Sequence, residues 1–488
     1  MVQPATIVRQ SSSSTTITPR MHLRTRQPAG RQSRFGGSAE DVGRRPPRSA
    51  VQQTTRCILL TVFRLVVITA VIGGWSAGVG AQGRQPEAAT QASGTGGVNH
   101  PSARSRPHVV LVSFDGFHPS YMTRFDTPHF ERLAARGMRA AGLVSVFPSL
   151  TFPAHYSIAT GLYPEAHGMV GNQFFDPARG AGFSYRRRGD AQDGSWWGGE
   201  PIWVTAETQG LVSAAFFFPG TEADIGGVRP SHWRPYDGRV PNRERVEQVV
   251  AWLALPPAER PHLVTLYFSL VDGAGHRLGP DHPDMRRSVE RADGLLGRLM
   301  AGVDALPHAD RVALVVVSDH GMAAPDPDET TVLREVADLR GVGLAVLGPS
   351  VSLRVGDPEE ALALRDRLNA RLVHARAYLR AELPDHLRAR GNARFGDLLV
   401  MPTGMGLVQL DPDDSAPAGT HGWDPTLAAM HGIFLAAGPG IAGGVTLPLV
   451  EAVDVYPLVA HLLGLTPNTG IAGSLAAFAP ALLATTAP

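Results

Sequence analysis

The stretch HVVLVSFDGF, residues 108–117, decides the fold that we expect for this chain. Its first seven residues, His108–Phe114, are a continuous run that is mostly apolar and rich in β-branched side chains. Such a run is typical of a strand that is buried on both faces, as in parallel sheets covered by helices on each side. Asp115 follows directly, so the predicted strand ends in a carboxylate.

Segments typical of strands and helices alternate after this stretch. Further strands are predicted over 212–218, 263–270 and 312–317, and helices over 130–137, 243–253 and 283–303. Strands separated by segments of helix length indicate βαβ units. The sequence therefore predicts an α/β fold with a mostly parallel central sheet and helices on both faces.

The pattern loosens between residues 331 and 410. A helix-like stretch over 358–383 lies between short predicted strands over 350–355 and 397–401. We therefore expect 331–410 to form a small inserted α+β lobe. The main pattern then resumes with a predicted strand over 432–437 and a closing helix over 450–463.

The first 81 residues have the pattern of a basic leader and signal peptide. Residues 1–56 are rich in Ser, Thr, Gln, Gly, Pro and Arg, a composition typical of disorder. Segment 57–74 is apolar apart from Arg64 and two threonines, and the small residues of 79–81 resemble a cleavage site. We expect cleavage after 81 and a periplasmic or extracellular protein. An uncleaved membrane anchor through 57–74 and a buried helix are the alternatives.

The remaining chain is expected to be a short linker followed by one folded domain. Residues 82–107 are rich in Gly, Ser, Ala and Pro, which predicts a flexible linker. The folded domain is expected over 108–488. Cys57 is the only cysteine, which excludes a disulfide framework, cysteine-based zinc sites and a cysteine nucleophile from that domain.

Charge is unevenly distributed between the leader and the rest of the chain. The first 81 residues carry 11 arginines against Glu40 and Asp41. The other 407 residues carry 34 arginines against 42 acidic residues, a net charge of −8. A mildly acidic body is a poor match for a polyanion, so we expect no specific nucleic-acid binding.

Acidic residues follow three of the predicted strands. Asp115, Asp272 and Asp319 each come after an apolar run, and open α/β sheets bind ligands beyond the carboxyl ends of their strands. Three carboxylates at one edge would repel each other unless cations neutralised them. His276 and His320 follow two of them closely, and mixed carboxylate and imidazole ligands favour zinc. Each motif alone would more simply be a strand-ending turn beside a surface histidine, but their coincidence predicts a metal site.

A nucleophile is offered by FPSLTFPAHYSIATG at 147–161. Pro153 fits the first turn of a helix over 153–160, so Thr151 would lie at or just before the helix N-terminus, where free N–H groups attract anions. A threonine at this position usually caps the helix. Beside bound metals, its hydroxyl could instead ionise and act as a nucleophile.

Seven motifs then follow one another in a characteristic order. They are SFDGF at 113–117, SLTFPAHYSIATGLYPEAHG at 149–168, GN at 171–172, WWGGEPIW at 196–203, LYFSLVDGAGH at 266–276, SDHGM at 318–322 and GTHGWDP at 419–425. Over about residues 108–465 the chain resembles the nucleotide pyrophosphatase/phosphodiesterase family of the alkaline phosphatase superfamily. The stretch at 216–238 looks most like the secreted bacterial branch. The resemblance implies an alkaline-phosphatase-like fold.

The resemblance also implies two Zn²⁺ ions per chain. The ligands of one zinc would be Asp272, His276 and His421, and those of the other Asp115, Asp319 and His320, with Thr151 bound to the second. On the sequence alone, His421 in its Gly-Thr-His-Gly loop would more simply be an exposed loop residue. Asn172 matches the asparagine that, together with the Thr151 backbone N–H, binds a non-bridging phosphoryl oxygen. Ala154 stands where many relatives carry asparagine, but this is not a ligand position.

Three aromatic residues match positions that surround the base and the neighbouring subsite in nucleotide-cleaving relatives. They are Phe152, Tyr236 and Tyr267, of which Phe152 and Tyr267 could equally be core residues. The resemblance thus implies a secreted enzyme acting on small-molecule phosphodiesters, namely nucleotides and dinucleotides. It would release nucleoside 5′-monophosphates through a phosphoryl-threonine intermediate and have no stable membrane partner once its leader is removed.

Two alternatives stay open, and one is excluded. The same chemistry could act on phosphodiesters of lipid or choline head groups, and a non-catalytic secreted binding protein is the alternative from another class. A sulfatase is excluded because the nucleophile region contains neither a cysteine nor a Ser-x-Pro-x-Arg motif. No arginine lies between Val144 and Gln173 around the predicted nucleophile, which favours diesters over the more highly charged monoesters.

Overall fold

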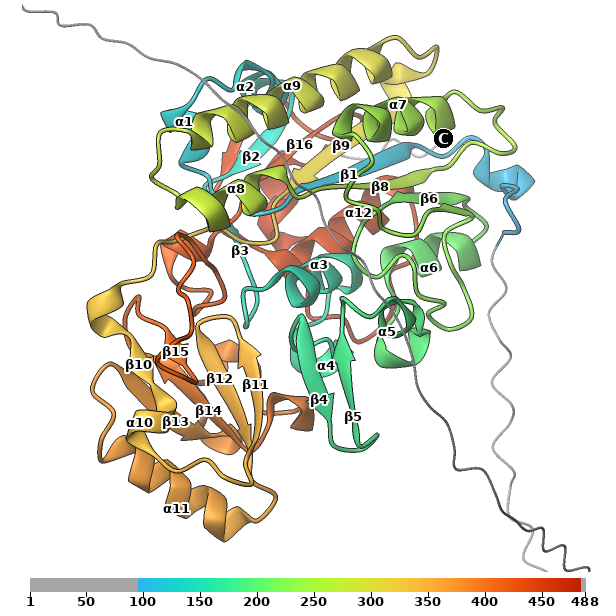
Figure 1. The fold of residues 1–488 in the computed structure, drawn as a ribbon. Coiled ribbons are helices and arrows are strands. Elements are labelled where there is room, and N and C mark those ends of the chain that lie inside the picture. Colours follow the sequence, from blue (N-terminus) through green and yellow to red (C-terminus); the bar gives the residue numbers. More distant parts are fainter. Residues whose placement is uncertain (1–94, 484–488) are drawn as a thin grey trace, which may run out of the picture. The chain divides into compact units, whose positions relative to one another are not determined.

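The computed structural model describes residues 95–483 (Figure 1). The predicted leader and signal peptide over 1–81, including Cys57 and the anchor segment 57–74, lie outside the described residues. Among those that are described, no helix combines the length and the apolar character needed to cross a membrane.

A mixed eight-stranded sheet forms the centre of the described chain, in the order β17-β2-β16-β9-β1-β8-β6-β7. Its strands are β1 (His108–Phe114), β2 (Met138–Ala140), β6 (Ser213–Phe216), β7 (His232–Trp233), β8 (Leu263–Phe268), β9 (Val312–Val317), β16 (Phe434–Ala437) and β17 (Val445–Leu447). Only β16 runs antiparallel to its two neighbours, and the other pairs are parallel. Every residue of β1 is buried, which confirms the predicted strand covered on both faces.

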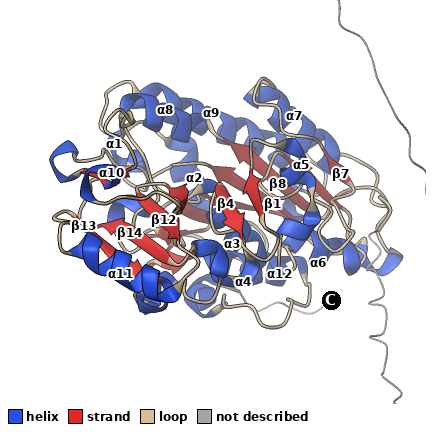
Figure 2. Ribbon diagram, turned by 60° about the horizontal axis from the view of Figure 1, so that its bottom comes forward, coloured by secondary structure: helices blue, strands red, loops and turns tan. Residues whose placement is uncertain are grey.

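Helices cover both faces of this sheet (Figures 1 and 2). On one side lie α2 (Pro128–Arg136), α7 (Asn242–Leu253), α8 (Leu270–Leu278) and α9 (Met285–Asp304); on the other lie α3 (Thr151–Thr160), α6 (Ile202–Thr208) and α12 (Val455–Leu463). Contacts of α9 with α2, α7 and α8, and of α12 with α3 and α6, hold each layer together. The α/β fold predicted from the alternating pattern is therefore confirmed.

The inserted α+β lobe is also confirmed, with different internal elements. It contains the antiparallel sheet β11-β12-β14-β13, against which the helix α11 packs; these elements are β11 (Gly343–Leu347), β12 (Ser350–Arg354), α11 (Pro358–Asn369), β13 (Ala375–Leu379) and β14 (Leu398–Pro402). The predicted continuous helix over 358–383 is wrong, because α11 ends at Asn369. The Asn369 side chain both donates to and accepts from the backbone of Ala377, at 2.9 and 2.8 Å, and thereby turns the chain into β13.

Shorter elements connect these layers. They are α1 (Tyr121–Arg124), β3 (Leu143–Val144), α4 (Pro164–His167), β4 (Gln173–Asp176), β5 (Ala181–Ser184), α5 (Arg188–Gln192), β10 (Thr331–Val332), α10 (Leu333–Val336), β15 (Val408–Gln409) and β18 (Val450–Glu451). Strands β10 and β15 pair at the two ends of the lobe, so the chain leaves and re-enters the main domain at one place. The predicted closing helix over 450–463 starts late, because Val450 and Glu451 pair with β3.

The end of the predicted linker is part of the folded domain. Asn99 is buried, and its side-chain nitrogen donates to the carbonyl of Arg260 at 2.7 Å. Its side-chain oxygen accepts from the backbone N–H of Val212 at 2.7 Å. Residues 95–107, which we expected to be flexible, therefore contact the segments that lead into β6 and β8.

Three buried histidines contact each other where β1, β8 and β9 begin. The rings of His108 and His262 stack with centroids 4.4 Å apart, and His308 lies 5.3 Å from His108. Burial, reinforced by repulsion from His262, lowers the pKa of His108 to about 3. Burial likewise lowers the pKa of His262 to about 4. These rings are therefore neutral in the folded protein at neutral pH.

This histidine cluster predicts a loss of stability in mild acid. Unfolded histidines bind protons with a pKa near 6.5, whereas the folded ones resist protonation. The free energy of unfolding is therefore highest above about pH 6.5 and declines as the pH falls toward 4, by on the order of 3 kcal/mol for His108 alone. Denaturant unfolding from pH 8 to 4 measures this slope. The variant His108→Gln, which cannot titrate, should show a shallower slope; an unchanged slope would contradict the assignment.

Candidate active site

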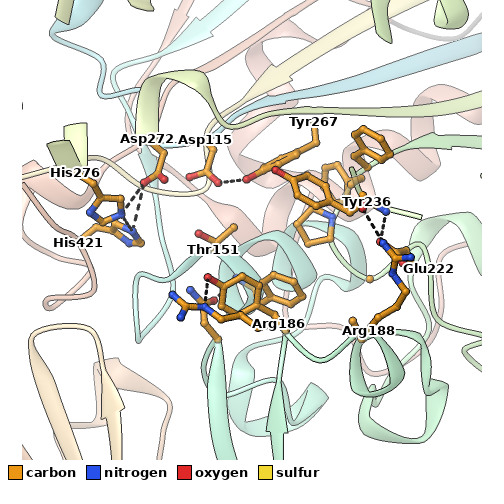
Figure 3. A pocket seen from close by; sticks show the side chains of 18 residues that line it. Asp115, Thr151, Arg186, Arg188, Glu222, Tyr236, Tyr267, Asp272, His276 and His421 are labelled. Carbon is orange, nitrogen blue, oxygen red and sulfur yellow. Dashed lines mark hydrogen bonds and ion pairs between the residues drawn. The ribbon is translucent and has the colours of Figure 1, made fainter. Parts of the chain in front are cut away.

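A pocket of about 570 Å³ opens where β1 and β8 end and α3 begins (Figure 3). Nine of the predicted site residues line it: Asp115, Thr151, Phe152, Asn172, Tyr236, Tyr267, Asp272, His276 and His421. The other two, Asp319 and His320, are fully buried and do not line it. The tertiary structure thus brings residues from five separate sequence motifs to one place.

The first group of possible metal ligands, which we call the α8 cluster, consists of Asp272, His276 and His421. Asp272 Oδ1 lies 3.2 Å from His276 Nε2 and 3.5 Å from His421 Nε2. The two histidine Nε2 atoms are 3.2 Å apart. His421 is buried, so the alternative of an exposed loop histidine is wrong.

Asp272 and His276 are one turn apart on α8 instead of following a strand. The predicted strand over 263–270 ends at Phe268, and Asp272 lies in the first turn of α8. Leu270 and Val271 extend the apolar run of β8, so hydrophobicity alone does not mark this boundary. The backbone N–H of Asp272 donates to the carbonyl of Asp115 at 3.0 Å, which holds the start of α8 against the end of β1.

The second group, which we call the buried cluster, consists of Asp115, Asp319 and His320. His320 Nε2 lies 3.0 Å from Asp319 Oδ2 and 3.4 Å from Asp115 Oδ1. The ring of His320 stacks on that of His421 with centroids 3.5 Å apart, so the two clusters are adjacent. Asp115 and Asp319 follow the central strands β1 and β9, as the sequence predicted.

All three cluster histidines are oriented in the same way. The Nδ1 atom of each lies near a backbone carbonyl: His276 near Gly419 at 2.8 Å, His320 near Gly321 at 2.9 Å, and His421 near Ser149 at 2.8 Å. A proton on Nδ1 satisfies such a carbonyl and leaves the Nε2 lone pair free. This is the usual arrangement of a metal-bound histidine, whose other nitrogen donates to the surrounding shell.

Several ligand atoms of both clusters lack a hydrogen-bond partner although they are buried. They are Asp115 Oδ1, Asp272 Oδ1, Asp319 Oδ2 and His320 Nε2. Buried polar atoms are normally paired, because leaving one unpaired costs about 1–3 kcal/mol. Unpaired oxygen and nitrogen atoms that face each other fit bound cations, and this donor set suits zinc.

The pKa values of the cluster residues also fit bound cations. Burial, followed by repulsion from Asp319 and Asp272, raises the pKa of Asp115 well above its ordinary value. Burial, followed by repulsion from His320, lowers the pKa of His421 to about 3, so this ring is a neutral donor at pH 7. Asp115 thus resists ionisation beside Asp272 and Asp319, and two divalent cations would remove this penalty.

Thr151 lies at the N-terminus of α3, as expected, but it does not cap the helix. The helix starts at Thr151, its capping position is Leu150, and the Leu150 side chain makes no capping hydrogen bond. The backbone N–H of Phe152 donates to Asn172 Oδ1 at 3.0 Å, which places the Asn172 amide beside the helix N-terminus. The Thr151 hydroxyl therefore lies in the pocket next to both clusters and is not used for capping.

Two supporting residues carry roles that the sequence did not suggest. His155, one turn after Thr151, is fully buried, and its Nδ1 lies 2.8 Å from the Thr151 carbonyl and 3.2 Å from Asp319 Oδ2. Tyr267 is only 7% exposed, and its hydroxyl donates to Asp115 Oδ2 at 2.5 Å. Its ring lines the pocket, while its hydroxyl orients a possible metal ligand. The four-residue spacing of Thr151 and His155 was the one available signal.

The outer part of the pocket has aromatic walls. The ring of Phe152 lies 5.2 Å from that of Tyr185, and the ring of Tyr236 lies 5.2 Å from that of Phe217. Tyr185 and Tyr236 are 37% and 42% exposed, so both can offer surface to a ligand. Phe217 and Tyr185 line the pocket as well but were not predicted.

Positive charge reaches the pocket from a segment that sequence reasoning overlooked. Arg186 and Arg188 line it together with one acidic residue, Glu222, outside the two clusters. The sequence around the predicted nucleophile, residues 144–173, contains no arginine. No local pattern could reveal that the segment after β5 folds over the same pocket.

The chain is similar to known phosphodiesterases in sequence. Residues 109–424 match the family model described as type I phosphodiesterase/nucleotide pyrophosphatase. Human ectonucleotide pyrophosphatase/phosphodiesterase family member 1 is 35% identical over 390 residues, covering 77% of this chain and 42% of that protein. A venom phosphodiesterase of Crotalus durissus collilineatus is 33% identical over 395 residues, covering 78% and 47%. The chain spans less than half the length of these curated relatives.

Two solved structures are covered almost completely by their match to this chain, unlike the longer curated relatives. Murine ectonucleotide pyrophosphatase/phosphodiesterase 5, an inactive variant in complex with AMP, has a TM-score of 0.73 and 30% identity, covering 77% of this chain and 100% of that one. The human protein of the same name also gives a TM-score of 0.73 at 30% identity, covering 77% and 99%.

Proposed function

Because the chain belongs to the type I phosphodiesterase/nucleotide pyrophosphatase family, we propose that it hydrolyses phosphodiester and pyrophosphate bonds of nucleotides and dinucleotides, using two zinc ions. The products would be nucleoside 5′-monophosphates. One observation carries this proposal: two three-residue clusters with unpaired ligand atoms flank the hydroxyl of Thr151 at a helix N-terminus. A non-catalytic binding protein would not need a hydroxyl nucleophile beside two clusters of metal ligands.

The residues have distinct roles in the proposed reaction. The α8 cluster and the buried cluster would each hold one Zn²⁺, and bound zinc would favour the ionised Thr151 hydroxyl and stabilise the departing oxygen. Thr151 Oγ1 attacks phosphorus while the bond from phosphorus to the leaving oxygen breaks. Water then attacks the phosphoryl-threonine and releases the monophosphate, so two inversions leave the configuration retained.

The protein groups around Thr151 stabilise charge and hold geometry. The Thr151 backbone N–H and the Asn172 amide would bind a non-bridging phosphoryl oxygen, where the α3 N-terminus also attracts negative charge. Tyr267 and His155 position Asp115 and Asp319, respectively. Because positioning and charge stabilisation dominate phosphoryl transfer, this scheme requires no separate general base.

The aromatic walls favour nucleotides over lipid or choline head groups. A planar base can stack between Phe152 and Tyr236, both of which line the pocket. Segment 57–81, with its signal-peptide pattern, supports a location outside the cytoplasm. The stretch at 216–238 supports membership of the secreted bacterial branch.

A substrate panel tests the proposal directly. We expect bis-p-nitrophenyl phosphate and the p-nitrophenyl ester of thymidine 5′-monophosphate to be cleaved well. The kcat/KM for p-nitrophenyl phosphate should be at least about a hundredfold lower, which corresponds to about 2.7 kcal/mol. A monoester brings a dianion, and the immediate neighbours of Thr151 are the neutral Phe152 and Asn172. Equal kcat/KM for the monoester and the diesters would overturn the assignment.

The variant Tyr236→Ala tests the stacking of the base. It should raise KM for the thymidine ester several-fold more than KM for bis-p-nitrophenyl phosphate, because only the nucleotide carries a base to stack. Steady-state kinetics on the two esters provide the comparison. An equal change in both KM values would exclude the stacking role.

A further inference from the structure

Three consecutive arginines, residues 186–188, lie at the rim of the pocket and differ in their partners. Arg187 Nη2 forms an ion pair with Asp190 Oδ2 at 2.6 Å, and Arg187 does not line the pocket. Arg186 and Arg188 do line it, and neither has an acidic partner within 4 Å among residues 95–483. Two guanidinium groups are therefore available to the pocket.

The two pocket arginines lie at different sides. Figure 3 shows Arg186 below Thr151, on the side of the pocket where His276 and His421 lie. In the same view Arg188 lies on the other side, next to Tyr236 and Glu222. Arg188 Nη2 donates to the Tyr236 carbonyl at 3.2 Å, and Glu222 Oε1 accepts from the Tyr236 N–H at 2.6 Å. Arg188 is therefore held beside a carboxylate that opposes binding of an anion.

Arg186 is held in a way that leaves its outer nitrogen atoms free. Its Nε donates to the hydroxyl of Tyr185 at 3.2 Å, and this is the only hydrogen bond that its side chain makes within residues 95–483. The two terminal nitrogen atoms remain to bind two oxygens of a phosphate at once, which is the geometry that favours arginine over lysine.

From this arrangement we propose that Arg186 binds a second, anionic phosphate in the leaving group. This proposal rests on the proposed function and assigns to Arg186 the preference for substrates whose leaving group carries a phosphate, such as nucleoside triphosphates and dinucleoside polyphosphates, over esters whose leaving group carries none. In our assignment the α8 cluster holds the cation that stabilises the departing oxygen, and Arg186 lies on that side of Thr151. A leaving group that continues into another phosphate would thus extend toward its guanidinium.

The reaction is a simple hydrolysis. With thymidine triphosphate, the bond between the α-phosphorus and the oxygen that bridges it to the β-phosphorus breaks. Water supplies the new oxygen on the α-phosphorus, and its hydrogens leave as protons or on the products. The products are thymidine monophosphate and pyrophosphate, and no further reactant is needed.

The test compares two substrates that share one nucleoside phosphate. Thymidine triphosphate releases pyrophosphate, whereas the p-nitrophenyl ester of thymidine 5′-monophosphate releases an aryl oxide without a phosphate. We expect Arg186→Gln to lower the ratio of kcat/KM values, triphosphate over ester, at least tenfold. Arg186→Lys should restore part of that ratio, because the charge returns without the two-nitrogen fork.

Two matched variants separate contact from general charge. Arg187→Gln removes a positive charge from the neighbouring residue, whose side chain does not line the pocket. Arg188→Gln removes a positive charge from the other side of the pocket, next to Tyr236 and Glu222. Both should change the ratio less than threefold. An unchanged ratio in Arg186→Gln, or an equal fall in Arg188→Gln, would overturn the proposal while the function stands. Wild-type protein that cleaves neither substrate would overturn the proposed function and this inference together.

Discussion

The variant Thr151→Ala should lose at least about a thousandfold in kcat on a nucleotide ester, equivalent to about 4 kcal/mol of barrier. Among the described residues that line the pocket, Thr151 alone carries an aliphatic hydroxyl, and this hydroxyl has no capping role whose loss would disturb the fold. Metal content should be unchanged, because the six Asp and His ligands remain. Steady-state kinetics and elemental analysis of the same preparation measure both quantities.

Thr151→Ser is the matched control for this prediction. It keeps a hydroxyl at the start of α3 and should retain far more activity than the alanine variant. Trapping of phosphate on the protein should succeed in wild type and fail in Thr151→Ala. If Thr151→Ala kept activity within a few-fold of wild type, water and not Thr151 would be the nucleophile.

Removal of bound metal should abolish activity and also destabilise the folded protein. Elemental analysis should find two zinc ions per chain, and dialysis against a chelator should remove them. Without cations, Asp115, Asp272 and Asp319 repel each other in a buried space, and the contribution of metal binding to folding is lost. We expect a loss on the order of 5 kcal/mol in the free energy of unfolding, measured by denaturant titration of the zinc-loaded and zinc-free protein.

A single-ligand variant connects this loss to the two clusters. His421→Ala should deplete one metal preferentially, because it removes one of three ligands from the α8 cluster and none from the buried cluster. Returning zinc to the chelated wild type should restore both activity and stability. Active protein that contains one metal ion per chain, or none, would refute the two-metal site.

Much of the fold was predictable because its signals are local. The strand over His108–Phe114 has the predicted bounds, since a mostly apolar run rich in β-branched side chains is typical of a strand in a covered sheet. Asp115 follows β1 directly and Asp319 follows β9 after one residue, so the expectation of acidic residues at one sheet edge also held for them. Predictions failed where local preference and tertiary contact disagree, as at Asn369, where hydrogen bonds to Ala377 end a helix that the composition would continue.

Composition and periodicity by themselves predicted the fold class and the inserted lobe, and the strand-end pattern predicted five of the possible ligands; His421 came only from the family resemblance. Only the tertiary structure decided how these side chains meet. It placed Asp272 on a helix, brought His421 back from beyond the lobe to within 3.5 Å of Asp272, and joined Tyr267 to Asp115. It also carried Arg186 to the pocket. The physical reason is that hydrophobic periodicity records how each segment faces the core, whereas a site is assembled by contacts between residues far apart in the chain, and these depend on how the packed segments are arranged in space.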